Sequence, residues 1–143
     1  MITETDSSTN NCQYCIKHHN LPLMSILKDE IFVKVIQKRD WDFLVGKLDD
    51  KVLKVLCLAE KITLYLNKIS EKEIKKMKLQ GFNNQQIIHI VLVINYFNFV
   101  NRNVFALGVK LEPNFHITTN CNFRLFSILL HNISSIFHSI KIY

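Results

Sequence analysis

The stretch Asn83–Gly108, NNQQIIHIVLVINYFNFVNRNVFALG, decides the fold class of this chain. Asn83 and Gln86 have the spacing of a capping box, in which each side chain satisfies a free backbone amide at a helix start. Mostly apolar residues follow, up to a glycine that suits a helix end. We predict the longest helix of the chain over roughly 84–107. Its apolar run, Ile87–Val100, has 14 residues and three polar side chains, so it is too short and too polar to span a bilayer.

Helical signals also fill the segment before this stretch. Ser70 and Glu73 form another capping box, and the helix that they open should end at Gly81. A stronger helix begins after Asp49 or Asp50, with apolar residues at helical spacing on its inner face. The sequence of the central part of the chain therefore predicts three successive helices.

Shorter elements are expected closer to the N-terminus. Asp40 is placed to cap a short turn over 41–44, which Gly46 interrupts. Apolar residues keep helical spacing over 23–38. Pro22 should kink or break the helix that precedes this segment, because proline lacks an amide hydrogen and its ring clashes with the preceding turn.

The fold class follows from the absence of strand signals as well as from the helices. No segment alternates apolar and polar residues convincingly, and three glycines and two prolines are too few for the turns of a sandwich or barrel. Near the C-terminus, apolar residues between Phe126 and Ile140 trace one more helix face. We predict an all-α fold.

Composition limits the classes of partner. The 143 residues suit one domain, and the net charge of +6 comes from 15 lysines against 3 arginines scattered along the chain. A nucleic-acid surface usually gathers its basic residues into a patch and uses arginine for bidentate contacts. We therefore expect a solvated basic surface with no nucleic-acid partner and no membrane partner.

The chemistry is expected near the N-terminus, in Cys12–His19 (CQYCIKHH), where a CxxC pair is followed by a histidine. In a helix, Cys12, Cys15 and His19 would share one face. Any of the polar residues 7–11 could cap that helix. A nearby imidazolium and a helix N-terminus both lower a thiol pKa, and the thiolate is the reactive form. The motif therefore suits dithiol redox chemistry.

The four cysteines, at positions 12, 15, 57 and 121, fit a reducing compartment better than a disulfide framework. No signal peptide precedes them, so we expect a cytoplasmic protein. A zinc site would need a second CxxC or a spaced histidine pair, which the remaining cysteines and histidines do not supply. We expect no metal and no cofactor, and a zinc-stabilised binding domain stays open as an alternative.

The CxxCxxxH motif, together with several later stretches, resembles the peroxidase-related branch of the alkylhydroperoxidase AhpD-like, carboxymuconolactone decarboxylase superfamily. The later stretches are Leu56–Lys61, Ser70–Phe82, Tyr96–Arg102 and Leu107–Val109. They occur in the family's order, and the match covers about residues 1–113. The resemblance implies an AhpD-like helical bundle over 1–113 and an obligate homo-oligomer.

The resemblance also implies an enzyme, a thiol peroxidase that acts as an antioxidant. Cys15 matches the cysteine that attacks the peroxide, Cys12 the resolving cysteine, and His19 the histidine of the proton relay. Attack makes Cys15 a sulfenic acid, which condenses with Cys12 to a disulfide. An external dithiol reductant, in related proteins a lipoyl-bearing partner, must then reduce the pair.

Two departures from the family pattern bear on this function. The relay glutamate expected twelve residues before Cys12 would precede Met1, and Glu4 lies one helical turn later on nearly the same face, so it is the candidate substitute. Residues 114–143 do not look like the family and form an atypical amphipathic tail. The alternative is therefore a catalytically impaired helical oligomerisation module that retains the superfamily fold.

Overall fold

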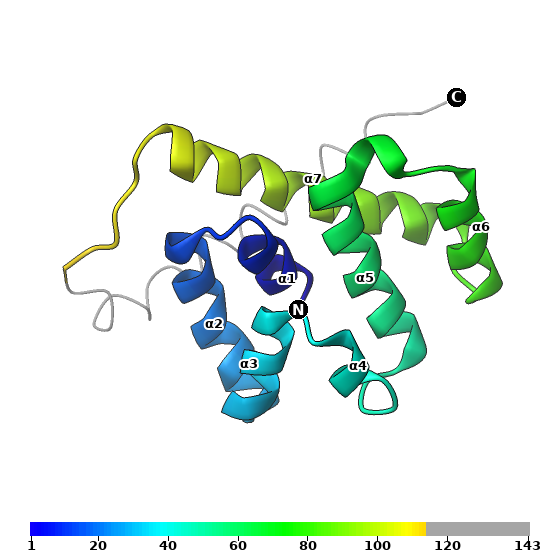
Figure 1. The fold of residues 1–143 in the computed structure, drawn as a ribbon, viewed down its shortest axis with the longest axis horizontal. Coiled ribbons are helices and arrows are strands. Elements are labelled where there is room, and N and C mark those ends of the chain that lie inside the picture. The colour runs from blue at the N-terminus through cyan, green and yellow to red at the C-terminus, as the bar shows by residue number, and fades with distance from the viewer. Residues whose placement is uncertain (114–143) are drawn as a thin grey trace. The chain divides into compact units, whose positions relative to one another are not determined.

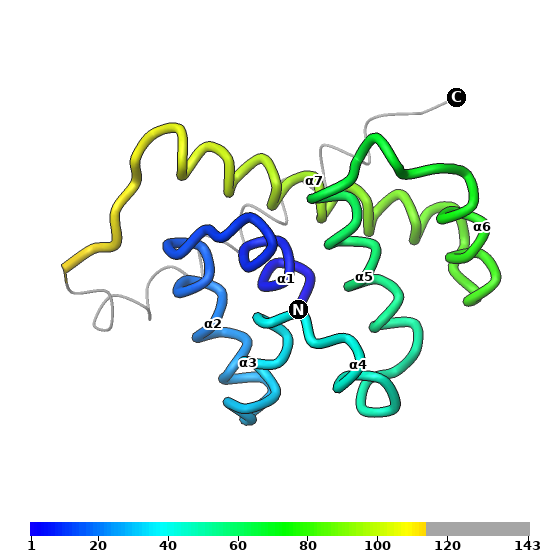
Figure 2. The backbone as a smooth tube through the Cα atoms, viewed as in Figure 1, coloured from blue at the N-terminus to red at the C-terminus, as the bar shows by residue number. Residues whose placement is uncertain are grey.

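The computed structural model describes residues 1–113, and within them every regular element is a helix. The prediction of an all-α fold is confirmed. Figure 1 shows the helices, and Figure 2 follows the backbone through them. In chain order they are α1 (Ile2–Thr9), α2 (Gln13–Leu27), α3 (Glu30–Lys38), α4 (Trp41–Leu44), α5 (Asp50–Tyr65), the 3₁₀ turn η1 (Leu66–Lys68), α6 (Glu71–Leu79) and α7 (Asn84–Ala106).

The predicted helix starts in the centre of the chain are confirmed by their caps. Asp40 accepts a hydrogen bond from the Phe43 amide at 3.1 Å and opens α4. Asp49 caps α5 in the same way. Both predicted capping boxes are formed at the starts of α6 and α7. After α6 the backbone turns at Gly81 with φ +85°, a conformation that glycine adopts without strain.

Two predictions about the N-terminal half are wrong. α2 runs through Pro22 to Leu27, because Leu23 packs into a buried cluster that outweighs one missing backbone hydrogen bond. The pattern over 23–38 is also not one helix. Lys28 adopts a left-handed conformation with φ 52°, and the Asp29 side chain accepts from the Phe32 amide at 2.9 Å to start α3.

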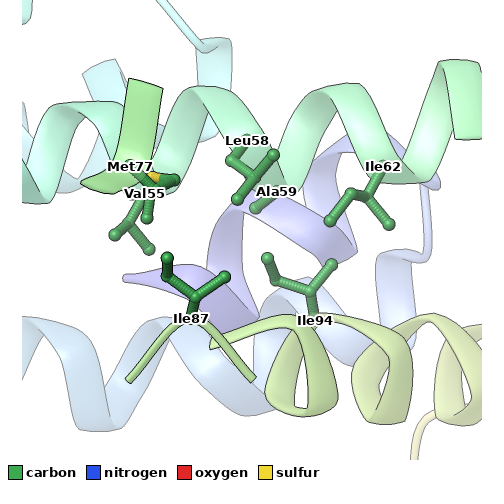
Figure 3. Packing of buried hydrophobic residues seen from close by; sticks show 7 residues of the cluster. All are labelled: Val55, Leu58, Ala59, Ile62, Met77, Ile87 and Ile94. Atoms are coloured by element: carbon green, nitrogen blue, oxygen red, sulfur yellow. The ribbon is translucent and has the colours of Figure 1, made fainter. Parts of the chain in front are cut away.

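Two hydrophobic clusters hold the helices together. The larger one joins α5, α6 and α7 through Val55, Leu58, Ala59, Ile62, Met77, Ile87 and Ile94 (Figure 3). The smaller one joins α2, α3 and α4 through Leu23, Val33, Ile36 and Leu44. Burying such side chains stabilises the fold by about 1.5–3 kcal/mol each.

The helix α1 was not predicted. Residues Glu4–Thr9 are all polar and all buried, and α1 packs against α2, α3, α5 and α7 (Figure 1). Polar residues 7–9 therefore lie inside this helix, where sequence reasoning expected a cap for the next one. Hydroxyl groups suit the position partly because they bond back to the preceding turn, as Ser7 Oγ does to the Thr3 carbonyl at 2.7 Å.

No helix among residues 1–113 has both the length and the apolar character needed to cross a bilayer. The predicted helix face between Phe126 and Ile140, and the predicted tail of residues 114–143, lie outside the described residues.

Candidate functional site

A tight turn between α1 and α2 places the cysteines. Asn11 adopts a left-handed conformation with φ 55°, which asparagine tolerates better than most residues. The chain then reverses, and the Cys12 amide donates to the Ser7 carbonyl at 2.9 Å. This bond fixes the start of α2 against the end of α1.

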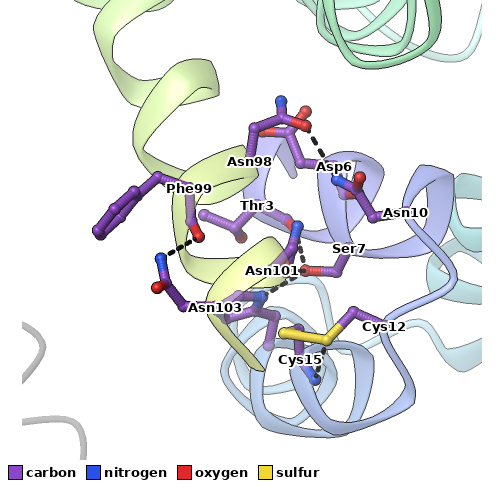
Figure 4. The surroundings of a disulfide bond; sticks show 11 residues. Thr3, Asp6, Ser7, Asn10, Cys12, Cys15, Asn98, Phe99, Asn101 and Asn103 are labelled. Atoms are coloured by element: carbon purple, nitrogen blue, oxygen red, sulfur yellow. Dashed lines mark hydrogen bonds between the residues drawn. A yellow bond between two sulfur atoms is a disulfide. The ribbon is translucent and has the colours of Figure 1, made fainter. Parts of the chain in front are cut away.

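Cys12 and Cys15 form a disulfide at the N-terminus of α2 (Figure 4). Cys12 is the N-cap residue, and its sulfur accepts a hydrogen bond from the Cys15 amide at 3.4 Å. Both side chains are almost fully buried, with exposed fractions of 1% and 3%. A thiolate on Cys12 would be stabilised in the reduced protein by this amide and by the positive end of the helix.

His19 lies one helical turn after Cys15 on α2, as the motif predicted. Its Nδ1 is 3.0 Å from Ser7 Oγ, and its ring meets Phe97 of α7 edge to face, with 5.2 Å between centroids. Burial lowers the pKa of His19 to about 4, with a smaller contribution from the charge of His18. The imidazole is therefore neutral at pH 7.

Ser7 is the residue of α1 that reaches His19, and sequence reasoning did not identify it. Its hydroxyl also lies 3.4 Å from Asn101 Oδ1 on α7, so three helices meet at this one oxygen (Figure 4). The contact joins residues twelve positions apart across the turn at Asn11. No sequence period signals such a contact.

Glu4, the expected substitute for the relay glutamate, points to a different neighbour. Its Oε1 accepts from Gln37 Nε2 at 2.9 Å, while its Oε2 is buried without a hydrogen-bond partner. Burial raises the pKa of Glu4 to about 7. The structure therefore gives Glu4 no hydrogen bond to His19.

A partly buried polar network beside the site ties α7 to α1 (Figure 4) and also to α5. Asn98 Nδ2 donates to Thr63 Oγ1 at 2.8 Å, and Asn98 Oδ1 accepts from Asn10 at 3.0 Å. Thr63 also lies 3.3 Å from Asp6 Oδ1. The sequence signal for the structural role of Asn98 and Asn101 is a pair of amide side chains three residues apart in a mostly apolar helix.

Within residues 1–113, no group of three or more histidine, cysteine, aspartate or glutamate side chains is placed to hold a metal ion.

The fold of the chain is similar to that of a solved protein. No protein-family model matches the sequence, and no curated protein matches it. A similar solved structure is that of an uncharacterized peroxidase-related protein from Silicibacter sp. TM1040, with a TM-score of 0.69 and 26% sequence identity. The match covers 80% of this chain and 59% of that one, so the chain spans somewhat more than half of the protein that it resembles.

Proposed function

We propose that this chain is a dithiol peroxidase of the AhpD-like type, in which Cys15 is the nucleophile, Cys12 the resolving thiol and His19 the proton relay. The observation that carries the proposal is the Cys12–Cys15 disulfide one turn before a half-buried, neutral His19. The similarity to a peroxidase-related protein supports the same reaction class.

The oxidative half of the reaction uses the two thiols in sequence. His19 takes the proton of Cys15, and the thiolate attacks one peroxide oxygen. The O–O bond breaks, the sulfur keeps that oxygen as a sulfenic acid, and the other oxygen leaves as alkoxide or hydroxide, which regains a proton from the imidazolium. Cys12 then displaces the sulfenic hydroxyl as water and forms the disulfide.

The reductive half needs an external dithiol. One thiolate of the reductant attacks Cys15, and Cys12 leaves as a thiolate that the Cys15 amide can stabilise. The second thiol of the reductant then displaces Cys15, which restores both cysteines and leaves the reductant as a disulfide. We propose a carrier of this class, such as a lipoyl-bearing protein, as the partner.

We also propose that the active form is a homo-oligomer. An open groove of about 520 Å³ runs between α7 and the end of α5 and its following turn. Large apolar side chains at or near it are well exposed in the single chain, among them Leu66, Phe99 and Phe105. Exposed apolar patches of this kind are typical of association surfaces.

The peroxidase proposal is tested by three variants of the full chain, each assayed for peroxide consumption with excess dithiothreitol. Cys15→Ser should lose turnover by at least about a hundredfold, since it removes the attacking sulfur. Cys12→Ser, reduced and then treated with peroxide after the dithiothreitol is removed, should stop at a sulfenic acid on Cys15 that a dimedone probe captures, as read by mass mapping. Cys57→Ser is the matched control, because Cys57 is a free, half-buried thiol on α5.

Full turnover by Cys15→Ser would refute the assignment of the nucleophile. The oligomerisation module of the alternative hypothesis gives a different pattern: no peroxide turnover in any variant, and thiols that titrate near the ordinary cysteine pKa of about 8.5.

A further inference from the structure

We infer that Ser7 is a positioning residue that holds His19 with its proton on Nδ1, so that Nε2 is the nitrogen that accepts the Cys15 proton. This inference rests on the proposed function, since it assigns the active nitrogen of the same site.

The assignment follows from the number of hydrogen bonds that one hydroxyl group can donate and accept. Ser7 Oγ has one hydrogen to donate and two lone pairs that accept. The Thr3 carbonyl can only accept, and at 2.7 Å it is the shortest contact of this oxygen. The Ser7 hydrogen therefore goes to Thr3, and His19 Nδ1, at 3.0 Å, must donate to Ser7.

A contact on α7 agrees with this direction. Asn101 Nδ2 is buried without a partner while its Oδ1 lies 3.4 Å from Ser7 Oγ. A half-turn of the Asn101 amide brings Nδ2 to the second lone pair of Ser7 and satisfies both groups.

The surroundings favour a fixed ring. Ser7 and Asn101 are completely buried, and Phe97 packs its ring against that of His19 from α7. A buried hydrogen bond is stronger than one in water, and an unmade one costs about 1–3 kcal/mol. The tautomer of His19 that carries its hydrogen on Nδ1 and donates it toward α1 is therefore lower in free energy. In that tautomer, Nε2 is the acceptor.

The tautomer is measured directly on the full-length chain with ¹⁵N-labelled histidine. Two-bond ¹H–¹⁵N spectra at pH 7 distinguish the protonated ring nitrogen from the unprotonated one. We expect His19 to show a protonated Nδ1 and an unprotonated Nε2. A protonated Nε2 in the wild-type chain overturns the inference, because the hydroxyl would then have to donate to His19.

The positioning role is measured by the reactivity of the reduced chain toward iodoacetamide, with the alkylation of Cys15 followed by mass mapping. Ser7→Ala should slow this alkylation about tenfold, a part of the roughly 10²–10⁴-fold that a positioned base contributes. Ser7→Thr keeps the hydroxyl and should restore most of the rate. Ser8→Ala is the control, because Ser8 is equally a buried serine of α1 but its hydroxyl has no hydrogen-bond partner.

These readouts separate the inference from the proposed function. If the tautomer and the Cys15 rates are as expected but the chain consumes no peroxide, Ser7 still positions His19 and only the peroxidase proposal fails. If Ser7→Ala alkylates Cys15 as fast as Ser8→Ala and the wild type, Ser7 has no positioning role, whatever the peroxide assay shows.

Discussion

Replacing the buried carboxyl group of Asp6 should stabilise the chain at alkaline pH and not at acidic pH. Asp6 has no exposed surface, its Oδ1 is 3.3 Å from Thr63 Oγ1, and its Oδ2 is buried without a partner. Burial raises the pKa of Asp6 from 3.8 to about 7, more than the hydrogen bond from Thr63 lowers it. The folded chain therefore holds a proton on Asp6 that the unfolded chain releases.

The sign and size of the effect follow from that proton. Between pH 3.8 and about 7 the folded state binds more protons than the unfolded state, so rising pH destabilises the fold. Each tenfold change in proton affinity is worth about 1.4 kcal/mol, which makes the full loss about 4 kcal/mol above pH 7. Asp6→Asn removes this loss. Its own unpaired amide adds a destabilisation of about 1–3 kcal/mol that does not depend on pH.

The assay compares urea unfolding of Asp6→Asn and the wild type at pH 4 and pH 8, followed by circular dichroism. The stability difference between the two chains should move by about 4 kcal/mol in favour of the variant on going from pH 4 to pH 8. Glu30→Gln is the control, because Glu30 is well exposed and pairs with Lys34 in the next turn. A difference between Asp6→Asn and the wild type that is the same at both pH values would refute the reasoning.

Two other substitutions test the packing around the site by the same unfolding assay. Pro22→Ala should stabilise the chain by about 1–2 kcal/mol, because α2 regains a backbone amide hydrogen in its interior. The more flexible unfolded state of the variant offsets only part of that gain. A destabilisation would mean that the proline ring itself is needed for packing. Asn98→Ala should cost about 2–4 kcal/mol, because Thr63 and Asn10 each lose one of their hydrogen bonds in a partly buried network. A loss below about 0.5 kcal/mol would contradict the importance of that network.

The parts of the fold that were predictable from sequence are those that local chemistry decides. Asp40 and Asp49 cap the helices that follow them, and Asn83 starts α7, because a cap needs only a side chain and amides two or three residues away. The same locality explains the turn at Gly81. These elements would form in nearly any compact arrangement of the chain.

The parts that could not be predicted depend on contacts between distant segments. The polar sequence of α1 reads as a loop or a cap, and only its position among four other helices makes it a buried helix. Pro22 was expected to kink or break a helix, yet α2 continues through it to Leu27, because the burial of Leu23 overrides the local preference. The pair of thiols was visible as a motif, whereas the contact between Ser7 and His19 depends on the turn at Asn11.

The helix α1 carries both a buried carboxyl group that destabilises the fold and a hydroxyl group that contacts the site. The two groups point in different directions. Asp6 faces Thr63 on α5, whereas Ser7 faces His19 on α2 and Asn101 on α7. Adjacent residues on a helix point about 100° apart. A neutral residue at position 6 can therefore relieve the buried charge and leave the hydroxyl at position 7 in place, so the stability of α1 and the orientation of His19 are separable properties of one short helix.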